Sequence, residues 1–142
     1  MDEVSFAARV AAAMFERDRA ATHTGIVLEE VRFGYARCRF TVTEAMLNGH
    51  DVCHGGFVFM LADTAFAYAC NSRNDAHVAL ACSISFSAAA RRDEVLTAVA
   101  EERTRSNRTG TYDVTVYGPT GDTVALFRGT SYRLGSQKVM RS

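Results

Sequence analysis

Residues 55–70 read GGFVFMLADTAFAYAC, and this stretch decides the fold. It is apolar nearly all round and rich in alanine, and its only formally charged residue is Asp63. An apolar segment of this length predicts a helix of about four turns that is buried on every side.

Patterns on either side of this helix predict the elements that cover it. In residues 3–17, Val4, Ala8, Ala11 and Phe15 recur at the spacing of an amphipathic helix. Two strand-like runs follow residues 24–25, and the second, residues 35–43, alternates apolar and polar side chains. A polar segment, residues 48–56, leads into the long helix, and a loop over residues 71–77 closes it.

The last third of the chain is β-like. Residues 78–87 alternate, with Leu80, Cys82, Ile84 and Phe86 predicted to share one face. Further strands are expected over residues 95–103, 111–117 and 123–132, the last two joined by a turn at residues 119–122.

This element order predicts an α+β fold in one domain, residues 1–142, with an antiparallel sheet curled around the long helix. A single sheet covers only one side of that helix. In a chain this short, the other apolar side is expected to meet a second copy, so we predict a homo-oligomer.

Composition limits which binding partners and which cellular compartment we expect. Lys+Arg and Asp+Glu both number 16, which indicates neither nucleic acid nor an anionic membrane as a partner. The longest apolar stretch, residues 57–62, is far too short to span a bilayer, and MDEVSF does not read as a secretory signal. The four cysteines lack CxxC spacing, so free thiols in a reducing, cytoplasmic compartment are expected.

Asp63 is the first candidate catalytic residue. A carboxylate in an apolar helix costs several kcal/mol unless something pairs with it. Two interpretations stay open: Asp63 makes a structural ion pair or backbone hydrogen bond, or it is a catalytic group in a low-dielectric site.

His54-Gly55-Gly56 at the start of the same helix is the second candidate feature. The first N–H groups of a helix lack internal partners and lie at the positive end of its dipole. Glycine lets another molecule approach them closely, so this end can hold a developing oxyanion. A plain glycine turn is the alternative.

Gly55 and Asp63 cannot act on one carbonyl from the same helix. They lie about 12 Å apart along the axis and roughly 80° apart around it. If two copies of the helix pack antiparallel across a two-fold axis, Asp63 of one copy faces Gly55 of the other. The spacing therefore favours a site built from two subunits.

The sequence resembles a known family at these residues. Residues 46–50 (MLNGH), 53–56 (CHGG), 61–72 (LADTAFAYACNS) and 124–129 (VALFRG) look like the hotdog-fold thioesterases of phenylacetate degradation. The resemblance implies a hotdog fold, a dimer of dimers, no cofactor or metal, and hydrolysis of phenylacetyl-CoA or a ring-hydroxylated relative.

The resemblance also implies roles for individual residues. Gly55 would polarise the thioester carbonyl, Asp63 of the facing subunit would act as general base or nucleophile, and Asn48 would orient water or the carboxylate. His54 would support the turn. The substrate-binding residues expected around them are Gly56, Phe57, Thr64, Arg91 and Arg92.

One stretch departs from the family pattern. Where relatives carry a proline-containing turn, this chain reads SAAARR at residues 87–92. Arg91 and Arg92, like Arg103, Arg105 and Arg108, either hold the phosphates of coenzyme A or form a solvated rim.

Other interpretations carry less weight. A metal site at His50, Asp51, Cys53 and His54 would be cramped, and adjacent Cys53 and His54 rarely present both groups to one point. An enoyl-thioester hydratase would be expected to place a histidine beside Asp63. A non-catalytic acyl-CoA binder would not need that carboxylate.

Overall fold

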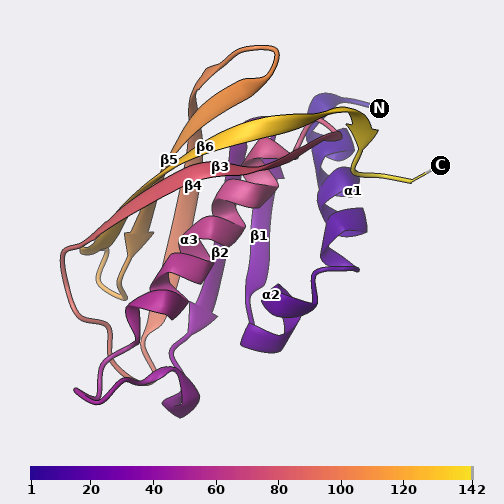
Figure 1. Ribbon diagram of the computed structural model, residues 1–142. Coiled ribbons are helices and arrows are strands. Elements are labelled where there is room, and N and C mark those ends of the chain that lie inside the picture. The colour runs from indigo at the N-terminus through magenta and orange to yellow at the C-terminus, as the bar shows by residue number, and fades with distance from the viewer. Residues whose placement is uncertain (142) are drawn as a thin grey trace.

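Six strands form one antiparallel sheet that curves around the helix α3 (Gly55–Cys70) in the computed structural model, which describes residues 1–141 (Figure 1). Their order is β1-β2-β4-β5-β6-β3. The strands are β1 (Val27–Arg32), β2 (Tyr35–Thr41), β3 (Asp75–Phe86), β4 (Val95–Arg105), β5 (Thr109–Tyr117) and β6 (Thr123–Lys138). The remaining helices are α1 (Glu3–Phe15), α2 (Arg19–Thr24) and the 3-10 helix η1 (Glu44–Met46). The predicted α+β architecture, a sheet wrapped around one long helix, is confirmed.

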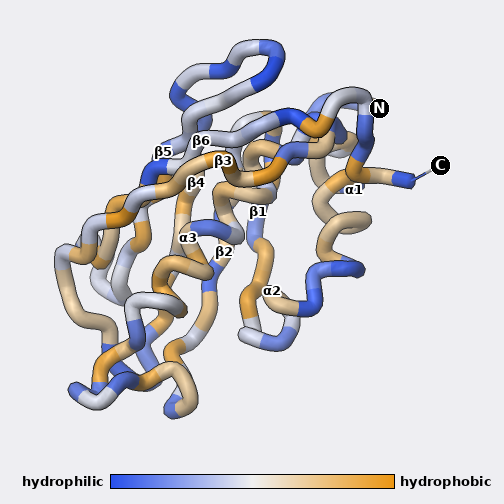
Figure 2. Tube along the Cα trace, in the orientation of Figure 1, coloured by the Kyte–Doolittle hydropathy of each residue, from blue (hydrophilic) through white to orange (hydrophobic). Residues whose placement is uncertain are grey.

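The core lies between α3 and the concave face of the sheet. Most of α3 is coloured toward the hydrophobic end in Figure 2, while the strands mix hydrophobic and hydrophilic positions. The Phe66 ring meets Tyr112 and Phe127 at centroid distances of 5.6 and 5.8 Å. Gly129 lies beneath the same ring, where an added Cβ would approach it to 2.8 Å. A glycine in β6 thus allows the helix to pack closely onto the sheet.

One side of α3 stays uncovered, so the prediction that it is buried on every side is wrong for a single copy. Gly56 is exposed, and Met60, Asp63 and Ala67 are partly exposed. These positions repeat every three or four residues and therefore form one stripe along the helix. A single sheet encloses the opposite side only, as the sequence argument anticipated.

Several element boundaries differ from the predicted ones. β3 begins at Asp75, inside the predicted loop, because Asp75 and His77 pair with Lys138 and Arg133 of an extended β6. Leu80 is 61% exposed, although the alternation placed it on one face with Cys82 and Ile84, which are partly buried. A register shift between Ala79 and Ala81 interrupts the alternation there.

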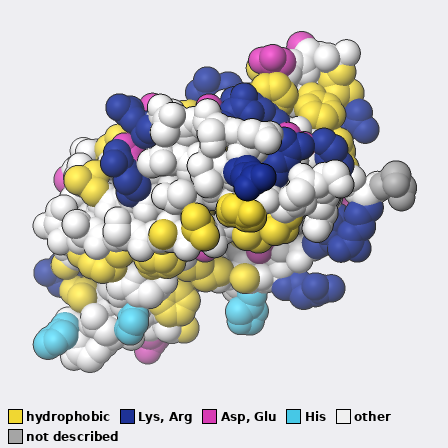
Figure 3. Space-filling view, turned by 45° about the horizontal axis from the view of Figure 1, so that its top comes forward, with side chains coloured by type: hydrophobic (Ala, Val, Ile, Leu, Met, Phe, Trp, Pro, Cys, Tyr) yellow, Lys and Arg dark blue, Asp and Glu magenta, His cyan; other side chains and the backbone are white. Residues whose placement is uncertain are grey.

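The two edge strands of the sheet differ in character. β1 carries charged side chains, has an irregular register and is packed against α1. From Val78 to Phe86, β3 carries no charge, and Val78, Leu80 and Phe86 are 47%, 61% and 54% exposed. Apolar side chains form a band across the surface in the space-filling view (Figure 3). An uncharged apolar edge of this kind is a template for pairing with another strand.

Within residues 1–141, none of the helices has the length and apolar character needed to span a bilayer.

Candidate active site

The segment before α3 is a turn that backbone hydrogen bonds hold in place. His54 N–H donates to Met46 O at 2.8 Å, and Cys53 N–H donates to Ala90 O at 2.7 Å. The side-chain oxygen of Asn48 accepts a hydrogen bond from His50 N–H at 2.9 Å. This leaves the Asn48 amide nitrogen without a partner among the described residues. The turn thus fixes where α3 begins.

His54 caps α3. Its Nδ1 accepts a hydrogen bond from Gly56 N–H at 2.9 Å, and its backbone oxygen accepts from Phe57 N–H at 2.9 Å. An Nδ1 that accepts is unprotonated, so a neutral ring carries its proton on Nε2. Of the first three amides of the helix, only that of Gly55 has no acceptor within residues 1–141. The helix therefore presents one free N–H at its positive end.

Asp63 lies on the uncovered stripe of α3, partly buried. Its carboxylate has neither a hydrogen-bond donor nor a cation beside it in the described part of the chain, and burial raises the pKa of this group. The alternative interpretation, an internal ion pair, therefore finds no partner there. A raised pKa makes the ionised carboxylate a stronger base than a solvated one.

The other predicted residues fall into two groups around this site. Gly56 and Phe57 lie in the first turn of α3, while Thr64 follows Asp63 and donates its hydroxyl hydrogen to Met60 O at 2.7 Å. Arg91 and Arg92 follow Ala90, whose carbonyl accepts from Cys53, so they lie beside the turn. Arg92 contacts Glu44 at 3.4 Å across an exposed surface.

The cysteines lack the features of nucleophiles or metal ligands. Burial raises the pKa of the Cys53 thiol to about 11, which is the opposite of the shift that activates a thiol. All four cysteines are free. Residues 1–141 contain no group of three or more His, Cys, Asp or Glu side chains placed to hold a metal ion.

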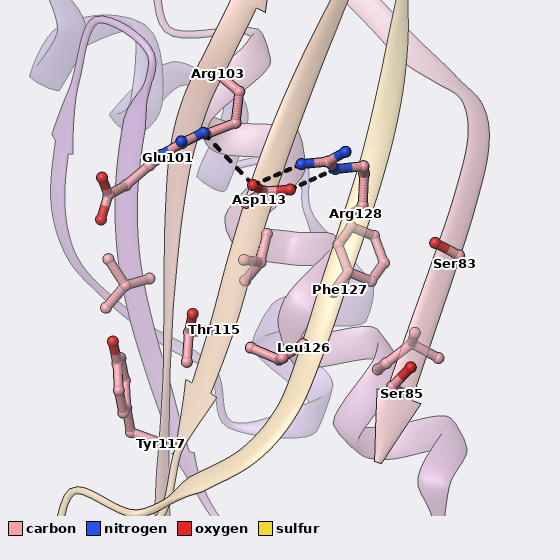
Figure 4. Close-up of a pocket in the computed structure, with 13 residues that line it drawn as sticks. Ser83, Ser85, Glu101, Arg103, Asp113, Thr115, Tyr117, Leu126, Phe127 and Arg128 are labelled. Carbon is pink, nitrogen blue, oxygen red and sulfur yellow. Dashed lines mark hydrogen bonds and ion pairs between the residues drawn. The ribbon is translucent and has the colours of Figure 1, made fainter. Parts of the chain in front are cut away.

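A hollow of about 430 Å³ lies on the face of the sheet that points away from α3. Asp113 occupies one end of it, with its carboxylate between Arg128 at 2.6 Å and Arg103 at 3.5 Å (Figure 4). The hydrogen bond from Arg128 lowers the pKa of Asp113. Because Arg103 is already paired, and Arg105 lies 3.8 Å from Glu102, these two arginines match the solvated-rim interpretation better than the phosphate one.

A second hollow, of about 450 Å³, opens beside Gly55. Its walls are Val52, Cys53, Gly55, Val58, Phe86 and residues 87–90. Phe86 is not among the residues predicted for the site, although the alternation of β3 placed it on one face with Cys82 and Ile84. This hollow is therefore bordered by Gly55, the residue whose amide has no acceptor within residues 1–141.

Comparison with known proteins decides the family. A family model described as the thioesterase superfamily matches residues 50–125, which is more than half of the chain. The chain belongs to the thioesterase superfamily. The match spans both the His54-Gly55-Gly56 turn and Asp63.

Relatives within the superfamily cover most of the chain. The acyl-coenzyme A thioesterase PaaI of Escherichia coli K12 is 49% identical over 123 residues, covering 87% of this chain and 88% of that protein. The solved structure of E. coli PaaI, from the phenylacetic acid degradation operon, matches with a TM-score of 0.94 at 46% identity, covering 96% of this chain and 99% of that one. The predicted family and the hotdog fold are confirmed.

Two further structures extend the comparison. A variant of the phenylacetic acid degradation protein PaaI of Thermus thermophilus matches with a TM-score of 0.80 at 37% identity, covering 82% of this chain and all (100%) of that one. A hypothetical thioesterase protein of Streptococcus pneumoniae, solved with coenzyme A, matches with a TM-score of 0.82 at 25% identity, covering 88% and 99% of the two chains.

Proposed function

We propose that this protein hydrolyses acyl-CoA thioesters to the free acid and coenzyme A, with phenylacetyl-CoA or a ring-hydroxylated relative as substrate. The observation that carries the proposal is Asp63, a partly buried carboxylate without a partner in residues 1–141 of a thioesterase-superfamily chain. The E. coli relative is an acyl-coenzyme A thioesterase, and two relatives belong to phenylacetic acid degradation.

The proposed site is shared by two copies of the chain. Gly55 and Asp63 are about 12 Å apart along α3, which is too far for both to reach one thioester. The stripe of Gly56, Met60, Asp63 and Ala67 and the bare edge of β3 lie where a second copy would cover them. Antiparallel pairing of two β3 edges would set the two helices antiparallel, with Asp63 of each facing Gly55 of the other. A dimer of dimers is the larger assembly we expect.

Hydrolysis would begin at the thioester carbonyl. Its oxygen would accept a hydrogen bond from Gly55 N–H, and the positive end of α3 would stabilise the negative charge that forms on it. Asp63 of the second copy would take a proton from the attacking water, or attack the carbonyl carbon itself. Collapse of the tetrahedral intermediate would break the C–S bond and release coenzyme A, whose thiolate would take the proton held by Asp63 or a proton from water. If Asp63 attacked directly, water would then hydrolyse the mixed anhydride, which frees the acid and restores the carboxylate.

Neighbouring groups would position the reactants. The free amide nitrogen of Asn48 would donate to the water or to the carboxylate of Asp63. His54 would hold the first turn so that the Gly55 amide points outward. Arg91 and Arg92 would bind the phosphates of coenzyme A beside the same turn. The proposed chemistry uses no metal or organic cofactor.

Replacing Asp63 with Asn tests the proposal. The amide keeps the size of the side chain but cannot act as a base or nucleophile, so kcat for phenylacetyl-CoA should fall by about a hundredfold or more. The KM should change little. Release of the thiol reports the rate.

Asp122→Asn, the same change in the exposed turn between β5 and β6, is the matched control and should leave kcat unchanged. Full activity of Asp63→Asn would refute the catalytic assignment. If the wild-type chain binds acyl-CoA but does not hydrolyse it, the non-catalytic binder is the correct interpretation.

A further inference from the structure

We propose that Phe86 and the hollow it borders receive the acyl group of the substrate, which makes Phe86 a residue that selects aromatic over aliphatic acyl groups. This inference rests on the proposed hydrolysis of acyl-CoA and adds the part of the site that distinguishes one thioester from another.

Phe86 lies directly against the glycine that carries the free amide. An added Cβ at Gly55 would meet the Phe86 ring at 3.0, 3.3 and 3.6 Å from three of its carbons. The ring is nevertheless 54% exposed in the single chain, so much of its surface is free to meet a substrate held between two copies. A phenyl ring placed in this way can contact a molecule bound at the Gly55 amide.

The position of the carbonyl limits which groups can fill the hollow. A thioester oxygen held by Gly55 N–H lies within about 3 Å of that nitrogen. The alpha carbon of the acyl group and the sulfur are both bonded to the same carbonyl carbon. The group that enters the hollow is therefore either the acyl group or the pantetheine arm.

The chemistry of the walls favours the acyl group. Apart from the Ser87 hydroxyl, the side chains around the hollow are those of Val, Cys, Phe and Ala, and its remaining polar surface is backbone. The pantetheine arm carries two amide groups, which need hydrogen-bond partners when they leave water. An aromatic acyl group has no such need and gains an offset or edge-to-face contact with the Phe86 ring.

The segment that follows Phe86 also lines the hollow, and its side chains are small. Residues 87–90 read SAAA, so they leave space beside the Phe86 ring. Backbone hydrogen bonds hold both ends of this wall: Ser87 N–H donates to Val124 O at 2.8 Å, and Ala90 O accepts from Cys53 N–H at 2.7 Å. This stretch is thus anchored to β6 and to the turn before α3, and it forms a preformed wall.

The test compares two substrates on the same enzyme. The ratio of kcat/KM for phenylacetyl-CoA to that for butyryl-CoA is measured in the wild type and in Phe86→Leu. Loss of an aromatic contact is expected to lower this ratio roughly threefold to tenfold, mostly through KM for the aromatic substrate. Because both rates come from one preparation, partial loss of folded or assembled enzyme cancels from the ratio.

A second variant changes the segment of small side chains that also lines the hollow. Ala89→Leu narrows the hollow and should also lower the ratio, since the larger acyl group is excluded first. Tyr117→Leu is the control: it removes an aromatic ring that is 36% exposed, on the far side of the sheet in the hollow of Figure 4. That variant should keep the wild-type ratio.

The outcomes separate this inference from the proposed function. A wild-type chain that hydrolyses phenylacetyl-CoA, with unchanged ratios in Phe86→Leu and Ala89→Leu, overturns the assignment of the acyl pocket alone. A wild-type chain that hydrolyses neither thioester overturns the proposed function itself.

Discussion

Asp18 and Asp63 are both partly buried aspartates, but their surroundings are opposite. One Asp18 oxygen accepts from Ala21 N–H at 3.1 Å and caps α2, while the other accepts from the Tyr68 hydroxyl at 3.0 Å. Asp63 has no such partner within residues 1–141. The contrast separates a carboxylate that holds the fold together from one available for chemistry.

Replacing Asp18 with Ala should destabilise the fold by about 2–3 kcal/mol, because it removes a helix cap and leaves the buried Tyr68 hydroxyl unpaired. Urea unfolding monitored by circular dichroism measures this change. Asp2→Ala is the comparison, since Asp2 caps α1 through Ser5 N–H at 2.8 Å and its side chain has no second hydrogen-bond partner within residues 1–141. The Asp2 variant should lose less stability than the Asp18 variant, because it removes a cap alone. Equal losses in the two variants would show that the Tyr68 hydrogen bond adds nothing.

Single residues were predictable where a local pattern isolates them. Asp63 is the one charge in an apolar helix, and Gly55 follows His54 at a helix start, so both can be identified from sequence. Phe86 and Asp18 cannot be identified in that way, because their partners lie far along the chain. Phe86 reads as one more apolar residue of an alternating strand until the fold places it against Gly55.

At the scale of elements, α3 has the bounds that were predicted, Gly55–Cys70, because its signals are local. Its apolar run is broken by a single charge, that of Asp63, and a turn precedes it. The start of β3 was missed because its first residues become a strand only by pairing with the end of β6. The short helix α2 was missed because six residues show too little periodicity.

The beginning of α3 depends on His54. Replacing His54 with Ala removes the acceptor for Gly56 N–H and should lower the free energy of unfolding by about 1 kcal/mol. His54→Asn retains a side-chain oxygen that can cap, so it should recover much of the loss. Denaturant unfolding provides the measurement.

His50→Ala is the matched control for the cap. His50 lies in the exposed turn before α3, and its ring makes no hydrogen bond within the described chain. This variant should unfold like the wild type. A His54→Ala protein as stable as His50→Ala would rule out a capping role.

At the scale of the whole molecule, the two edges of the sheet differ. The edge strand β1 carries charged side chains and packs against α1, while the other edge strand, β3, is uncharged from Val78 to Phe86. The sequence predicted that the apolar side of α3 needs a second copy, because a sheet covers only one side of a helix. The sequence did not indicate which strand would lie at the edge, since strand order depends on the complete fold.

A charge on the open edge tests the role of a second copy. Leu80→Lys places a cation on β3, where charged side chains oppose strand pairing. Light scattering should then show a shift of mass toward the single chain, and hydrolysis of phenylacetyl-CoA should fall with it. Val27→Lys makes a comparable change on the opposite edge strand, β1, and should alter neither property. A single-chain Leu80→Lys protein with full activity would exclude a shared site.

The separation of Gly55 from Asp63 along α3 has a genetic consequence. In the shared arrangement, one chain damaged at Asp63 and another damaged at Gly55 are defective in different halves of a site. When such chains pair, both lesions meet at one of the two sites and the other site is intact. Two inactive alleles in the same cell would then restore up to half of the activity of a normal dimer.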